Sequence, residues 1–260
     1  MNTISPTLEE IQNFKGKYPK QLWYLFMVEM WERFCFYGMR GVLTFFMVDQ
    51  LFLKDDAANL QYGAIQAFVY AFTFIGGIFA DKILGFRKSL FFGGIIMILG
   101  NLLIAYSPQE LFYYGIAFSI IGTGFFKPNI SSMVGELYHE SDHRRDAGYG
   151  MFYAGINIGG LLGGALCIYL GKYYSWRLCF LSAAIVMILG LFTFLFTKKH
   201  LGPIGNSPLL LLDASKRKMQ EIAVYVGSLI CIPFIFIMVK NTDYTDYFMY
   251  TIGVIALLYF

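Results

Sequence analysis

The sequence predicts an all-α membrane protein whose helices cross the bilayer several times. Of its 260 residues, 57% are hydrophobic and only 14% are charged, whereas a soluble domain carries about 25% charged residues. Several apolar runs approach the roughly 20 residues that a helix needs to span a bilayer. The formal net charge of +3 is too small to indicate a nucleic-acid partner.

The chain begins with a polar tail, residues 1–20, which contains no cleavable signal pattern. The first membrane helix is predicted over residues 21–52 and would act as its own insertion signal. A short turn, Lys54 to Asp56, follows it. Further spans are predicted over residues 61–80, 89–106, 110–137, 148–171, 178–197 and 222–239, and an eighth apolar run begins near Tyr247.

These spans predict four regions: the tail (1–20), a six-helix transmembrane bundle (21–198), a polar linker (199–221) and an extra transmembrane hairpin (222–260). The last apolar run reaches Phe260 without a polar residue to anchor its end. We therefore interpret the chain as a fragment, truncated within the hairpin.

The distribution of cations predicts the topology, because cytoplasmic loops carry an excess of lysine and arginine. The loops expected on the side of the tail carry Lys82, Arg87, Lys88, Arg144, Arg145, Lys198, Lys199 and a cluster at 216–218. The opposite loops carry only Lys54, Lys172, Arg177 and Lys240. The tail and linker are expected to be cytoplasmic, in a multi-pass protein of the cell membrane.

The first span carries an unusual set of charges, Glu29, Glu32, Arg33 and Arg40. At about 100° per residue these side chains, with Tyr37, fall within an arc of about 140°. A charge at mid-bilayer costs at least about 2.5–3.5 kcal/mol, so such a stripe must face a water-filled cavity or a polar bundle interior.

Glutamates beside an arginine provide a means of coupling proton movement to anion binding. Burial favours the protonated carboxyl group, whereas a neighbouring arginine favours the charged one. A ligand carboxylate that occupied Arg33 would allow Glu32 to take up a proton. The alternative is a static ion network that only holds the helix in place.

A lone lysine, Lys127, lies near the middle of the fourth span and is too central to reach the surface easily. It is expected to enter the same cavity and meet a glutamate or an anionic ligand, or else to be paired for structure alone. In the fifth span, Asn157 is the one amide in an apolar, glycine-rich turn. It could bind a ligand or hydrogen-bond another helix.

The loop between the second and third spans combines Asp81, Gly85, Arg87 and Lys88. Gly85 permits a tight turn, and Asp81 could tie the loop to cations or a helix N-terminus. The alternative is an ordinary positively charged loop.

Metal binding and catalysis are not indicated. The four cysteines lie in apolar segments without a CxxC pair, and His139 and His143 have zinc-pair spacing but no obvious third ligand. We find no mid-membrane Ser/His/Asp set and no HExxH motif. No cofactor and no enzyme activity are therefore expected.

Three motifs resemble signatures of the proton-dependent oligopeptide transporter family of the major facilitator superfamily. The first, Glu29-x-x-Glu32-Arg33-Phe34-x-Phe36-Tyr37-Gly38, is similar to the family's ExxERFxYYG. The others are Gly122-Thr123-Gly124 with Lys127-Pro128-Asn129, and Phe152-Tyr153 with Asn157-Ile158-Gly159. Residues 81–88 resemble the superfamily's loop between its second and third helices.

The resemblance implies the N-terminal half of a symporter that carries di- and tripeptides by alternating access, driven by the proton gradient. It implies proton coupling by Glu29, Glu32 and Lys127, and a gating loop at Asp81, Gly85, Arg87 and Lys88. It implies peptide binding by Arg33, Arg40, Tyr37, Tyr70, Lys127 and Asn157. Many bacterial members carry two extra helices between their halves, which the runs after residue 222 would match.

Two departures qualify this expectation. Phe36 stands where the signature usually has tyrosine, and the family's second six-helix bundle lies beyond this sequence. Alternatives are a transporter of nitrate or another small anion, and a non-transporting membrane receptor on the same bundle.

Overall fold

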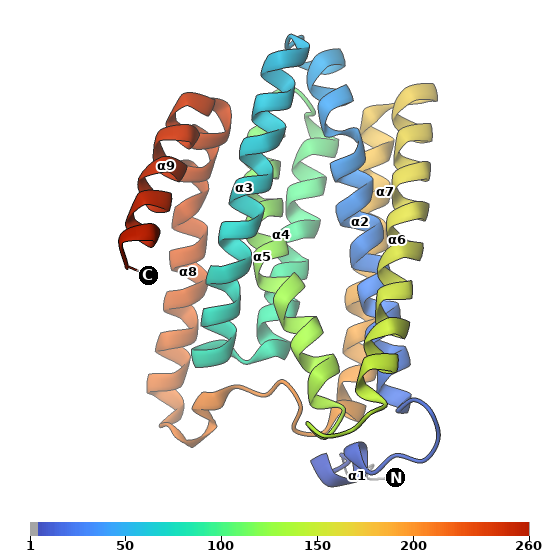
Figure 1. Ribbon diagram of the computed structural model, residues 1–260. Coiled ribbons are helices and arrows are strands. Elements are labelled where there is room, and N and C mark those ends of the chain that lie inside the picture. The colour runs from blue at the N-terminus through green and yellow to red at the C-terminus, as the bar shows by residue number, and fades with distance from the viewer. Residues whose placement is uncertain (1–4, 260) are drawn as a thin grey trace.

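The computed structural model describes residues 5–259, and every regular element in that range is helical. The long helices run up and down side by side, joined by short connections (Figure 1). They are α2 (Lys20–Gln50), α3 (Asp55–Phe79), α4 (Phe86–Tyr106), α5 (Phe112–Glu136), α6 (Arg145–Tyr173), α7 (Trp176–Thr197), α8 (Ala214–Lys240) and α9 (Thr242–Tyr259). The short elements are α1 (Leu8–Gln12), η1 (Ala80–Leu84), η2 (Lys198–Leu201) and η3 (Pro208–Leu211).

The all-α membrane fold expected from the sequence is confirmed. Five helical segments within the described residues are long and apolar enough to cross a membrane: 55–84, 86–106, 145–173, 176–201 and 214–240. Helices α2 and α5, which carry the charged residues of the expected site, are not among them, since polar residues interrupt their apolar runs.

Several helices begin earlier than the apolar runs suggested, and the difference is largest for α3 and α8. The prediction of a turn from Lys54 to Asp56 is wrong for Asp55 and Asp56, which form the first residues of α3. Carboxylates in the first turn of a helix stabilise its positive N-terminal end. Likewise α8 begins at Ala214, where the side chain of Asp213 caps the helix by accepting a hydrogen bond from the Ser215 N–H.

Helix α2 packs mainly on α6 and α7, α5 packs on α3 and α4, and α4 also packs on α7. Helices α8 and α9 stand at the side of the bundle, beside α3 (Figure 1). Small residues allow the closest crossings. A Cβ atom on Gly124 of α5 would lie 2.5 Å from the Phe72 carbonyl oxygen of α3, so these backbones pack directly on each other.

The tail, η1, the loop between α5 and α6 and the linker after α7 gather at one end of the bundle (Figure 1). Gln12 Nε2 donates to the Glu136 carbonyl at 3.1 Å, and the Gly205 N–H donates to Glu136 Oε2 at 3.1 Å. The linker is therefore packed against the bundle instead of crossing open solvent.

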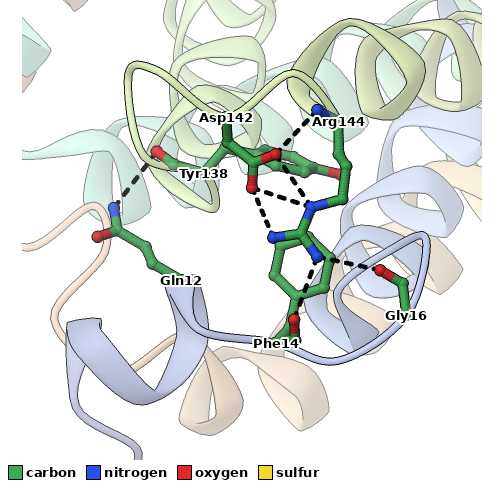
Figure 2. A network of polar contacts seen from close by, with 6 residues as sticks. All are labelled: Gln12, Phe14, Gly16, Tyr138, Asp142 and Arg144. Atoms are coloured by element: carbon green, nitrogen blue, oxygen red, sulfur yellow. Dashed lines mark hydrogen bonds and ion pairs between the residues drawn. The ribbon is translucent and has the colours of Figure 1, made fainter.

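Arg144 holds the tail to this end of the bundle. Its guanidinium binds both carboxylate oxygens of Asp142 and donates to the carbonyls of Phe14 and Gly16 at 3.2 and 3.1 Å (Figure 2). These hydrogen bonds lower the pKa of Asp142 to about 2 and raise the pKa of Arg144. The loop and the tail thus form one charged contact.

Candidate functional site

A cluster of three charged side chains lies buried within α2. Glu29, Glu32 and Arg33 have 1%, 0% and 2% of their surface exposed. Arg33 Nε lies 2.8 Å from Glu29 Oε1 and 2.6 Å from Glu32 Oε2. The spacing of four residues places Glu29 and Arg33 on one face of the helix, and the adjacent Glu32 reaches the same nitrogen with its side chain.

Helix α6 packs on the backbone of this cluster. A Cβ atom on Gly159 would lie 3.0 Å from Arg33 Cβ and would collide with the Met30 carbonyl. Glycine at this position therefore lets α6 cover the turn of α2 that carries the charges, which keeps them away from lipid.

The cluster carries more acid than base. When all three groups are ionised, two carboxylates face one guanidinium, which leaves one negative charge. Glu29 Oε2, Glu32 Oε1 and Arg33 Nη2 are also buried without a hydrogen-bond partner among the described residues. Buried polar groups are almost always satisfied, so this arrangement is suited to accept a proton or a further polar group.

Lys127 approaches the cluster from α5. It interacts electrostatically with Glu29, Glu32 and Arg33, yet it forms no ion pair within 4.0 Å in residues 5–259. Its side chain is half-buried, and its ammonium lies 5.2 Å from the centroid of the Tyr70 ring. Tyr70 itself is 61% exposed. This cation is therefore close to the acids but unpaired within the described part of the chain.

Arg40 lies farther along α2, among aromatic rings. Its Nε donates to the Tyr62 hydroxyl at 2.7 Å, and its guanidinium lies 5.9 Å from the Tyr37 ring centroid. The structure thus brings Arg40 and Tyr37 together, as the helical stripe requires. Sequence reasoning missed Tyr62, because only the packing of α3 on α2 brings the two side chains together.

Asn157 is exposed on α6, and its side chain makes no hydrogen bond within residues 5–259. Two buried amides, Asn129 of the Lys127-Pro128-Asn129 motif and Gln61, do tie helices together. Asn129 Nδ2 donates to Ser89 Oγ of α4 at 2.8 Å, and Gln61 Oε1 accepts from the Tyr113 hydroxyl at 3.0 Å. In the sequence, Asn129 has a place in a motif but no evident partner, and there is no signal for Gln61, which begins the predicted span 61–80.

The expected gating loop lies at the end of the bundle that carries the tail. Gly85 has a positive φ of 76°, and a Cβ atom there would lie 2.5 Å from the Ser207 nitrogen. Arg87 donates to the Gly202 carbonyl at 2.7 Å, and Lys88 pairs with Glu221 at 2.6 Å. Asp81 is exposed and forms no ion pair with the residues described, so the loop is held by its glycine and cations.

Comparison with known proteins shows which family this chain is similar to. Residues 87–211 match the family model described as POT family. The chain is 41% identical over 200 residues to "Uncharacterized transporter YclF" of Bacillus subtilis (strain 168), covering 73% of this chain and 40% of that protein. It is 32% identical over 209 residues to "Dipeptide and tripeptide permease A" of Serratia proteamaculans (strain 568), covering 80% and 41%.

Solved structures of POT family transporters are also similar to this chain. A crystal structure of a peptide transporter POT in complex with sulfate matches 98% of this chain and 54% of its own length, with a TM-score of 0.76 and 31% identity. A POT family transporter in complex with 5-aminolevulinic acid matches 96% and 54%, with a TM-score of 0.79 and 30% identity. The chain spans about two fifths of the length of the curated relatives it matches.

Proposed function

The chain belongs to the POT family, and on that premise we propose that it supplies the N-terminal half of a proton-coupled symporter of di- and tripeptides. The observation that carries the proposal is the buried Glu29–Arg33–Glu32 cluster with Lys127 beside it. Two relatives are named dipeptide and tripeptide permease A, which supports the substrate class.

The proton step rests on the excess acid of the cluster. A proton on Glu29 or Glu32 removes the extra negative charge and leaves one carboxylate for Arg33. Release of that proton restores the excess and strengthens the attraction for Lys127. Uptake and release of one proton therefore alter the charge balance between α2 and α5, which is the kind of change that can bias two conformations.

The substrate step assigns the peptide carboxylate to Lys127 in preference to Arg33. Arg33 is 2% exposed and already faces two carboxylates. Lys127 is half-buried and has no acidic partner within 4.0 Å in the described range. Arg40, Tyr37, Tyr70 and Asn157 complete the proposed peptide-binding surface, in which the exposed Asn157 of α6 would act as a donor and acceptor.

For orientation, we propose that the tail, the gating loop of residues 81–88 and the linker lie in the cytoplasm of the cell. These segments gather at one end of the bundle together with most of the loop cations (Figure 1). A second six-helix bundle would close the peptide site, and rocking of the two bundles would expose it alternately to each side.

The test is uptake of labelled dialanine into proteoliposomes that hold the complete transporter, with the interior alkaline. We expect accumulation that requires the pH gradient and is reduced by excess unlabelled dialanine but not by nitrate. Uptake of labelled nitrate without uptake of labelled dialanine would instead assign the protein to anion transport. Absence of any uptake by correctly folded protein would favour the receptor alternative.

A further inference from the structure

We propose that a groove bounded by α4, α7, α8 and the linker binds one anionic phospholipid. The groove encloses about 770 Å³ at the end of the bundle that carries the tail. It lies apart from the charged cluster of α2, because none of its lining residues belongs to α2 or α5. The inference does not depend on peptide transport.

Cations line the polar end of the groove. They are Arg87, Lys88, Lys198, Lys199 and Arg217, and no aspartate or glutamate lines it. Glu221 nearby neutralises part of this charge, since Lys88 Nζ lies 2.6 Å and Arg217 Nε 4.0 Å from its carboxylate.

Beside Arg87, the lysines Lys198 and Lys199 supply most of the positive charge that remains. Both are exposed, and neither forms an ion pair within 4.0 Å in the part of the chain that the structure describes. They directly follow Thr197, where the membrane helix α7 ends. A phosphate group at this height would lie where lipid head groups lie.

The rest of the groove is apolar and runs along the membrane-spanning parts of the same helices. Its walls are Phe91, Phe92 and Ile95 of α4, Phe194 and Leu195 of α7 and Tyr225 of α8. The ring centroids of Phe92 and Tyr225 lie 4.7 Å apart, so α4 and α8 contact each other along this wall. Since α4 starts at Phe86, residues 91–95 lie about 8–14 Å along the helix from that end.

The position of the cations and of the apolar residues along the groove indicates which kind of ligand fits it. Cations at the helix ends and an apolar wall deeper in the membrane match a phospholipid with a net negative head group and an acyl chain. A free phosphate would use only the cationic end, and a zwitterionic lipid would gain little from the unpaired lysines. Basic pockets between membrane helices on the cytoplasmic side are known lipid-binding features.

The experiment measures phosphatidylglycerol retained by the purified full-length protein in native mass spectrometry, against phosphatidylcholine with the same acyl chains. We expect wild type to prefer phosphatidylglycerol. We expect Lys198→Gln/Lys199→Gln to bind this lipid at least about tenfold more weakly than wild type does. Lys216→Gln/Lys218→Gln removes the same charge from the same end of the molecule, at residues that do not line the groove. This control is expected to bind like wild type.

A second variant tests the apolar wall without changing charge. Ile95→Trp is expected to lower phosphatidylglycerol retention, while circular dichroism and a monodisperse elution profile remain those of wild type. Equal retention of both lipids by wild type, equal losses in the two lysine pairs, or full displacement by glycerol phosphate would each overturn the proposal. Unaltered retention in Ile95→Trp would reduce the site to a surface that attracts anions.

Discussion

Lys127 is the residue whose surroundings most clearly separate a ligand-binding role from a structural one. Its ammonium faces the Tyr70 ring and has no acidic partner within 4.0 Å in residues 5–259. A lysine kept only for structure would be expected to hold a paired carboxylate.

We therefore predict that Lys127→Gln raises the KM for dialanine transport about 10- to 100-fold, the loss expected for one charge-assisted hydrogen bond of about 1.5–3 kcal/mol. Dialanine amide, which lacks the carboxylate, is the matched substrate, and its weaker transport should change little. The measurement is concentration-dependent uptake of both compounds by both proteins. Equal changes for the two substrates would assign Lys127 to packing.

Asp142 gives a prediction about pH. Its pKa, lowered to about 2 from an ordinary value of 3.8, means that the native contact favours the carboxylate. The contribution to stability is therefore present above about pH 4 and is lost as the pH falls toward 2. Since Arg144 also binds Phe14 and Gly16, the tail should loosen in the same range.

Hydrogen exchange of residues 12–18, corrected for the intrinsic rate at each pH, measures this loosening. Asp142→Asn should show fast exchange at pH 6 already and no further step on acidification. A wild-type tail that stays protected at pH 2 would mean that Asp142 does not hold it.

At the scale of single residues, the sequence predicted contacts between side chains of the same helix. Glu29 and Arg33 meet because residues four apart lie on the same face of an α-helix. The contact of Arg40 with Tyr62 depends on which helix packs beside α2, and the exposure of Asn157 depends on how α6 is turned. Neither can be read from spacing within one helix.

At the scale of the helices, close crossings between small residues set the packing. Gly124 of α5 meets the backbone of α3 at Phe72, with no room for a Cβ atom. By contrast, a Cβ atom on Gly63 of α3 would find nothing within 4 Å.

We predict that Gly124→Ala destabilises the protein by about 1–3 kcal/mol, because α3 and α5 must separate. Gly63→Ala should leave the melting temperature unchanged or raise it, because alanine favours the helix more than glycine does. Thermal unfolding in one detergent, followed by circular dichroism, compares the two variants. Equal melting temperatures would show that this crossing has room to relax.

The helices themselves were largely predictable, because apolar runs of membrane length leave few alternatives. The residues at which the helices begin were less predictable. The polar first turns of α3 and α8 lie outside the apolar runs, and aspartates at or just before the helix start stabilise them. Hydropathy alone therefore places these starts too late.

For the whole molecule, the contacts that hold the tail, the loops and the linker together at one end could not be predicted from the sequence. Arg87, Arg144 and Gln12 hold it through carbonyl groups of distant segments. Every residue offers such a carbonyl, so the sequence gives no sign of which ones are used. The charge bias of the loops indicated that these segments share a side, but not that they contact one another.

The central claim is that the buried acids of α2 couple proton movement to peptide movement, and Glu32→Gln in the complete transporter tests it most directly. The amide keeps the shape of the side chain but cannot release a proton. We predict at least a tenfold loss of dialanine accumulation driven by a pH gradient, while exchange of dialanine across proteoliposomes at equal pH remains. Gradient-driven accumulation at the wild-type level in Glu32→Gln would contradict the account.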